Sequence, residues 1–178
     1  MFGMPLHPLV VHFPIVLTFL LPISVLVALW TIRRGTTRRR AWAVPFAVAA
    51  ALSLSSFVAV ETGENEEDRV ERVVAEGVLH GHEEAAERFL VLSGVLLLIA
   101  AAGFLPKTVG QAARLVTAVG AIVLVAAGAQ VGHSGGTLVY RHGAASAYAD
   151  PAMARPGGES VAAVSARAER ADDEDRDR

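Results

Sequence analysis

The chain has 178 residues, 53% of them apolar, no cysteine and a formal net charge of −2. A mean hydropathy of +0.44, with the charges confined to a few segments, excludes an ordinary soluble domain, whose charges are spread over every element. The lack of cysteine excludes disulfides, thiolate metal sites and covalent c-type haem, and the near-neutral charge gives no reason to expect nucleic acid as a partner.

Four long apolar segments follow one another along the chain. Charged side chains are missing from residues 1–32, 41–60, 89–106 and 115–140. About 20 apolar residues cross the hydrocarbon core of a membrane, and these segments are apolar all round rather than amphipathic. We therefore predict an all-α fold, a four-helix transmembrane bundle, with helices near residues 8–32, 41–61, 84–105 and 110–132. The first segment lacks the basic start of a cleaved signal peptide and is too long for one.

Basic residues predict the orientation of the bundle. The loop RRGTTRRR between the first two predicted helices has five arginines and no acid, and Lys107 lies in the next loop on the same side. Short basic loops stay in the cytoplasm, so both termini and the loop of residues 62–83 are expected outside a cytoplasmic membrane. Trp30 and Trp42 flank the arginine loop, where an aromatic belt at the inner interface would lie.

The outer loop and the carboxyl end have their own patterns. Valines recur at helical spacing in the outer loop, which predicts a short amphipathic helix containing Val70, Val73, Val74 and Val78. From residue 144 onward the chain is rich in Ala, Ser, Gly, Pro and charge. We therefore divide it into a four-span domain, residues 1–143, and a disordered polar tail, residues 144–178.

Imidazoles gather near the predicted outer ends of the helices. The six histidines and one carboxylate found there are His7, His12, Glu61, His80, His82, His133 and His142. Imidazole is a common ligand of metal ions and of haem iron, and sites in helical bundles are built from facing helices. His12 lies about one turn, roughly 6–8 Å, inside the apolar segment, where a polar group needs a partner.

Each of these residues also has an interpretation that involves no ligand. His7 fits an interfacial position before a helix that starts with proline, and His12 fits a hydrogen-bond partner of Glu61 or of a backbone carbonyl. The others fit solvated loops, helix ends or interface anchors, namely His80, His82, His133 and His142. The functional hypothesis therefore depends on the clustering and not on any single histidine.

Ionisable side chains are missing from the middle of every predicted helix, and histidines are missing from the inner ends. Ion-coupled transporters place such groups, or broken helices, at the midplane of the membrane, so coupled transport is disfavoured. A relay of two haems would need histidines at both depths, so the sequence allows one haem site, near the outer face.

Four motifs, HPLVVHFPI, ETGE, HEEAAE and GHSGGTLVYRHG, together resemble a bacterial membrane protein family, domain of unknown function 2231, over about residues 4–143. The resemblance implies four membrane spans. Similar domains occur fused to Rieske or cytochrome c modules, which implies membrane redox chemistry. The positions that carry over are His7, His12, Glu61, His82, Gly135, Gly136, Tyr140 and His142, whereas the place of His133 often holds another residue.

We therefore predict a histidine-lined site for haem b or a metal ion, copper or zinc, at the outer face, serving electron transfer. The predicted haem ligands are His12, His82, His142 and His133. The predicted ligands of a metal ion are His7, His12, Glu61 and His82, where Glu61 can instead fix an imidazole tautomer. The alternative is a non-catalytic membrane module whose outer cluster is a structural polar cap, docks a partner or senses pH. The expected partners are the lipid bilayer and a redox protein on the outer side, with self-association left open.

Overall fold

A computed structural model describes residues 6–148, within which all regular secondary structure is helical. The chain divides into two units, Met1–Ala147 and Tyr148–Arg178, and the first contains all of the long helices. Its elements are α1 (His7–Val10), α2 (His12–Arg33), α3 (Arg38–Glu64), α4 (Glu67–Val70), α5 (Glu76–Ala102), α6 (Lys107–Tyr140) and the 3-10 helix η1 (Ala144–Tyr148). The four long helices, counting α1 and α2 as one span, are long and apolar enough to cross a membrane.

The predicted helices are confirmed, but their ends differ. Helix α5 begins at Glu76 rather than at 84, and α6 continues to Tyr140 rather than to 132. The predicted ends follow the apolar runs, whereas both helices continue into more polar, glycine-containing sequence, EGVLHGHE at the start of α5 and HSGGTLVY at the end of α6. The 34 residues of α6 extend about 51 Å, well beyond a core of about 30 Å.

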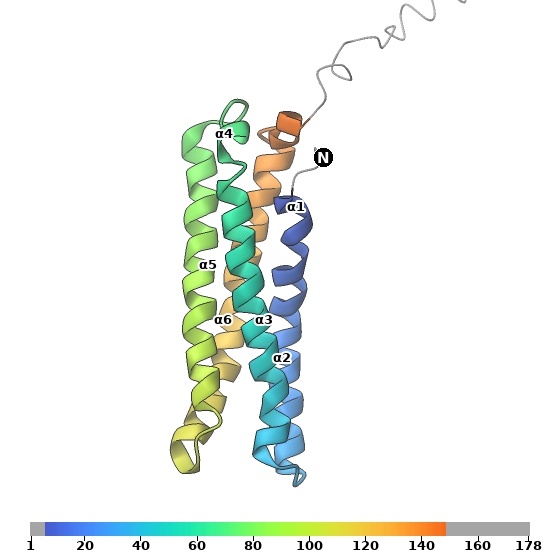
Figure 1. Cartoon of the computed structure of the whole chain (residues 1–178), viewed down its shortest axis with the longest axis vertical. Helices are drawn as coiled ribbons and strands as arrows, with labels where there is room; N and C mark the ends of the chain where they lie inside the picture. Colours follow the sequence, from blue (N-terminus) through green and yellow to red (C-terminus); the bar gives the residue numbers. More distant parts are fainter. Residues whose placement is uncertain (1–5, 149–178) are drawn as a thin grey trace, which may run out of the picture. The chain divides into compact units, whose positions relative to one another are not determined.

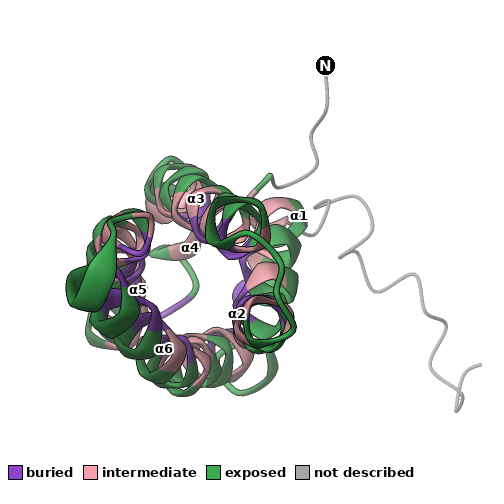
Figure 2. Ribbon diagram, turned by 90° about the horizontal axis from the view of Figure 1, so that it is seen from below, coloured by how far each residue is buried: buried purple, intermediate pink, exposed green. Residues whose placement is uncertain are grey.

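The long helices alternate in direction and form a closed ring of neighbours (Figure 1). Helix α2 packs against α3 and α6, and α5 packs against α3 and α6. Seen along the bundle, the buried residues face the common axis and the exposed residues face outward (Figure 2). The outward faces carry large apolar side chains, as expected where lipid surrounds the helices, for example Phe13, Phe19, Leu54, Leu98 and Val119.

The inward-facing residues of each long helix recur at alternating spacings of three and four, and we call these positions the axial seam. On α3 the buried positions are Trp42, Pro45, Ala49, Leu52, Ser56 and Ala59. On α6 they include Gly110, Arg114, Thr117, Ala121, Leu124 and Leu138. A period of 3.5 residues keeps one stripe of a helix facing its neighbours in a left-handed bundle. Many seam residues are small, which lets the backbones approach closely.

Hydroxyl groups in the seam are satisfied within their own helices. Thr18 donates to the carbonyl of Pro14 at 2.6 Å, Ser56 to Leu52 at 2.7 Å and Thr117 to Ala113 at 2.8 Å. The seam therefore stays narrow in the middle of the bundle without leaving these buried donors unpaired.

The loop between α3 and α5 differs from the single amphipathic helix that the valine spacing predicts. One helical turn, α4, ends at Val70, and Ala75 is extended, so the segment is broken before α5 begins. The valines still form an apolar face that packs inward, because Val74 is buried and Val70 and Val78 pack beside it. Val74 shares a small core with Leu79, Leu138 and Ala144.

The start of the predicted tail, residues 144–148, is described by the structure. Its first five residues form η1, in which Ala144 is buried. The rest of the predicted tail, residues 149–178, lies outside the described residues.

We predict that Gly103→Ala destabilises the bundle by about 1–3 kcal/mol, the usual cost of overpacking a well-packed core. A Cβ at Gly103 would overlap the indole of Trp42, which is fully buried and donates its Nε1–H to the Ala100 carbonyl at 2.8 Å. The matched control is Gly94→Ala on α5, where a Cβ meets nothing within 4 Å. Thermal unfolding in detergent checks this, and equal midpoints for the two variants would contradict it.

Candidate functional site

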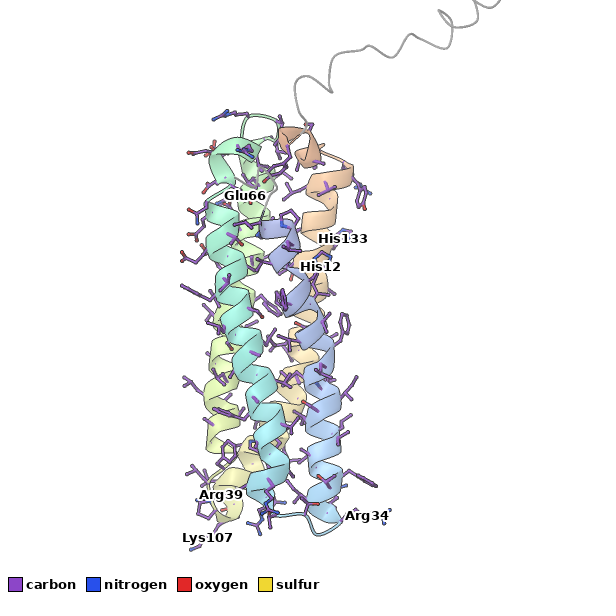
Figure 3. The ribbon with its side chains drawn as sticks, turned by 45° about the vertical axis from the view of Figure 1, so that its right-hand side comes forward. His12, Arg34, Arg39, Glu66, Lys107 and His133 are labelled. Carbon is purple, nitrogen blue, oxygen red and sulfur yellow. The ribbon has the colours of Figure 1, made fainter. Side chains whose placement is uncertain are left out.

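The two ends of the bundle differ in chemistry (Figure 3). His12, His133 and Glu66 lie toward one end, and Arg34, Arg39 and Lys107 lie at the other. We call these the histidine end and the arginine end. The histidine end is built from α1, the end of α3, α4, the start of α5 and the end of α6, so the expected gathering of imidazoles at one end is confirmed.

Two of the six imidazoles meet at the histidine end. The rings of His7, on α1, and His82, on α5, lie edge to face, with centroids 6.4 Å apart and planes at 83°. Both side chains are half-buried. His82 lies seven residues before the buried Phe89, and His7 lies seven residues before the buried Pro14. Both therefore occupy axial seam positions, which explains why they face each other.

Hydrogen bonds define which nitrogen of each ring carries the proton. Nδ1 of His7 lies 2.8 Å from the carbonyl oxygen of Ala59, which can only accept. Nδ1 of His82 lies 2.8 Å from Oγ of Ser134, and that hydroxyl donates its single hydrogen to the carbonyl of Val131 at 2.9 Å. We infer that Nδ1 is the protonated nitrogen in both neutral rings. Each Nε2 then has a free lone pair.

Glycines on the two neighbouring helices leave room for the rings. A Cβ at Gly63 on α3 would lie 3.2 Å from Cε1 and Nδ1 of His7. A Cβ at Gly135 on α6 would lie 3.1 Å from Cε1 of His82. Both distances are shorter than ordinary packing contacts, so the lack of a side chain at these two positions makes room for the two rings.

Glu66 fixes the start of α1. One of its carboxylate oxygens accepts the backbone N–H of Leu6 at 2.7 Å and that of His7 at 3.3 Å. A carboxylate at the amino end of a helix satisfies free donors and complements the helix dipole. The contact ties His7 to the turn that follows α3.

Neither Glu66 nor Ser134 was among the residues expected from the sequence. The spacing of the seam residues could have identified the inward-facing histidines, because His7 and His82 continue the repeat of three and four along their helices. Nothing in the sequence singles out Glu66 among ten neighbouring acids.

The other predicted ligands do not join this pair. His12, the first residue of α2, is exposed, and its Nδ1 lies 3.2 Å from the carbonyl of Leu9 in α1. His12 follows His7 by five residues, so it is rotated away by roughly 140° at about 100° per residue. The remaining candidates are also exposed, namely Glu61, His80, His133 and His142. Within residues 6–148 no three His, Asp or Glu side chains are grouped closely enough to hold a metal ion.

The sequence matches the family described as Predicted membrane protein (DUF2231) over residues 3–147. The chain belongs to this family. The match covers every described helix and confirms the resemblance drawn from the four sequence motifs. No curated protein and no solved structure matches the chain.

In this DUF2231 protein, the His7–His82 pair is the most chemically capable arrangement at the histidine end. Two imidazoles with their Nδ1–H groups occupied can offer two Nε2 lone pairs to one electrophilic centre. The two imidazoles come from opposite sides of the bundle. His7 lies on α1 and is bonded to α3, whereas His82 lies on α5 and is bonded to α6.

We predict that Ser134→Ala changes the tautomer of His82. Loss of the hydroxyl removes one acceptor of the His82 ring and leaves the backbone carbonyl of Val131, so the proton moves only in part to Nε2. Nitrogen NMR of histidine-labelled protein distinguishes the two forms. Ser93→Ala is the matched control, because Ser93 makes the same bond to its own helix, to Leu90 at 2.8 Å, on α5 eleven residues beyond His82. A wild-type His82 protonated at Nε2 would contradict the assignment.

Proposed function

We propose that this membrane protein holds a redox-active metal centre, a copper ion or the iron of haem b, between Nε2 of His7 and Nε2 of His82, and that it serves electron transfer. The observation that carries the proposal is the pair of half-buried rings whose Nδ1 atoms are both bonded to oxygen. Metal-bound histidines typically donate their second nitrogen to such an acceptor, which fixes the tautomer and orients the ring.

The spacing of the rings suits a shared ion. Two imidazoles that bind one ion from opposite sides, at metal–nitrogen distances of about 2.0 Å, have centroids roughly 6–6.5 Å apart. The lone pair of Nε2 lies in the plane of its ring, so one ring must turn from the edge-to-face arrangement for both lone pairs to reach the ion. The centroids of His7 and His82 are 6.4 Å apart.

The small number of protein ligands favours copper or haem iron over zinc. Structural zinc takes four ligands and catalytic zinc takes three from the protein, whereas the described residues bring only two imidazoles together. Imidazole binds copper and iron well, and haem supplies the remaining iron ligands itself. A bound centre of either kind would supply one-electron chemistry at the histidine end.

Charge around the site suits a partner protein. Residues 61–88, which surround the histidine end, carry ten acids and three arginines. Such an excess of negative charge attracts a positively charged partner and speeds its encounter. A soluble redox protein with a basic face fits this surface.

The second candidate function is a structural polar cap. The hydrogen bonds of His7 to Ala59 and of His82 to Ser134 also satisfy both rings without any ligand. In that case the pair closes the histidine end of a non-catalytic module, and the acidic loop docks a partner.

Metal analysis, an absorption spectrum and copper titration of the protein in nanodiscs test the proposal. We expect one copper or one haem for each chain, with a reduced-minus-oxidised spectrum in the case of haem. His7→Ala and His82→Ala should each weaken binding by more than about 100-fold, because each removes a direct ligand, and loss of an outer hydrogen-bond partner alone typically costs 10- to 100-fold.

The controls remove an equivalent imidazole that lies elsewhere. His12→Ala and His133→Ala change exposed histidines of the same end and should leave binding unchanged, with the thermal midpoint showing that every variant is folded. A colourless protein that takes up neither copper nor haem would overturn the proposal in favour of the polar cap. Binding that is lost in His12→Ala but unchanged in His7→Ala would overturn the assignment of His7 as a ligand.

A further inference from the structure

A cavity of about 430 Å³ lies at the arginine end, away from the histidine pair. Helices α2, α3 and α6 contribute its walls. Four of the side chains that line it are cationic, namely Arg33, Arg38, Lys107 and Arg114.

These cations have no carboxylate beside them. Asp and Glu are missing from residues 1–60 and from residues 88–149, so no acid belongs to the described helices at this end. Two ion pairs, His80 with Glu83 and Arg88 with Glu84, belong to the acidic segment at the other end. Four positive charges around one cavity repel each other, and an anion inside it would relieve that repulsion.

Arg114 is a buried cation with few partners in the protein, which strengthens the case for an anion in the cavity. It occupies an axial seam position, is only 5% exposed and donates from Nη1 to the carbonyl of Gly103 at 2.5 Å. That is its single protein acceptor among the residues that the structure describes. A guanidinium has five N–H donors, and a buried charge is costly unless it is paired. The part of Arg114 that lines the cavity is therefore suited to an anion.

The start of α6 adds further donors. Lys107 and Thr108 are its first two residues, both line the cavity, and no side chain caps this end of the helix. The first N–H groups of a helix and its dipole favour an anion. The amide of Gln111, one turn on, also lines the cavity.

The remaining wall of the cavity is apolar. Leu29, Ile32 and Leu115 line it beside the cations, and Leu115 is 51% exposed on the outside of the bundle. A free inorganic anion would use only the polar wall, whereas a lipid would place its phosphate on the cations and its chains on the leucines and isoleucine. Basic pockets between transmembrane helices are known to bind anionic lipid headgroups.

We propose that this cavity binds the phosphate group of an anionic membrane lipid. General attraction of arginines to an anionic membrane surface does not account for the cavity, because neighbouring arginines outside the cavity already provide that attraction. Arg39 and Arg40 do not line the cavity, and Arg34 lies over the ring of Trp30, 5.3 Å from its centroid.

Native mass spectrometry of the full chain released from nanodiscs tests the proposal. The nanodiscs contain phosphatidylglycerol, which is anionic, mixed with phosphatidylcholine, which is zwitterionic. We expect wild-type protein to retain phosphatidylglycerol preferentially. Arg38→Gln and Lys107→Gln should each reduce that preference roughly tenfold or more, since a direct hydrogen bond between charged groups contributes about 1.5–3 kcal/mol, which corresponds to at least roughly tenfold.

Arg39→Gln and Arg40→Gln are the matched controls, because they remove the same charge from the first turn of α3, next to Arg38, without touching the cavity. They should change the preference by much less than Arg38→Gln. Equal losses in all four variants would overturn the proposal, because the anionic membrane surface would then attract all four cations alike, inside and outside the cavity. Inorganic phosphate that bound wild-type protein in pure phosphatidylcholine with the same variant pattern would overturn a lipid as the occupant. Variants of Arg114 are avoided because its burial links binding to folding.

Discussion

The bundle depends on one constraint, the close approach of four helices along the axial seam. Lipid tails are as apolar as leucine, so apolar surface alone does not hold transmembrane helices together. Contact must come from tight packing, and the seam of α3 alternates Trp42 and Leu52 with the small residues Ala49, Ser56 and Ala59. The same repeat continues to both ends of the bundle. There it also places polar side chains toward the axis, His7 and His82 at one end and Arg114 at the other, and so it creates the two candidate sites.

The two ends satisfy their inward-facing polar groups in different ways. At the histidine end, the protein itself supplies an oxygen for Nδ1 of His7 and for Nδ1 of His82. At the arginine end, Arg114 receives one carbonyl and no carboxylate from the described residues. A neutral imidazole can be stable with its own hydrogen bonds, but a buried guanidinium requires an opposite charge. The need for an external ligand is therefore stronger at the arginine end, although histidines are the more familiar ligands.

The sequence predicts the four helices and the separation of histidines from arginines, because long apolar runs and basic loops are strong signals. It does not predict which histidines face inward. In a segment that is apolar all round, hydropathy has no preferred face, so His12, deep in the apolar run, looked more constrained than His7. The inward face is decided by small residues at seam spacing, which place His7 inward and His12 outward. The roles of Ser134 and Glu66 come from contacts between distant helices, at separations of 52 and 60 residues, and no local pattern encodes them.

The histidine pair lies where the two helical hairpins of the bundle meet. His7 is anchored on α3 through Ala59, and His82 is anchored on α6 through Ser134. Helices α2 and α3 form one hairpin and α5 and α6 the other, so the contact between the two rings joins the two hairpins at one end. An ion shared by the rings would cross-link the hairpins there, whereas without an ion only an edge-to-face contact would join the two rings, worth about 0.5–1.5 kcal/mol for aromatic pairs. Binding at this pair would therefore stiffen the junction between the hairpins, and any change of oxidation state would act where the two halves of the bundle meet.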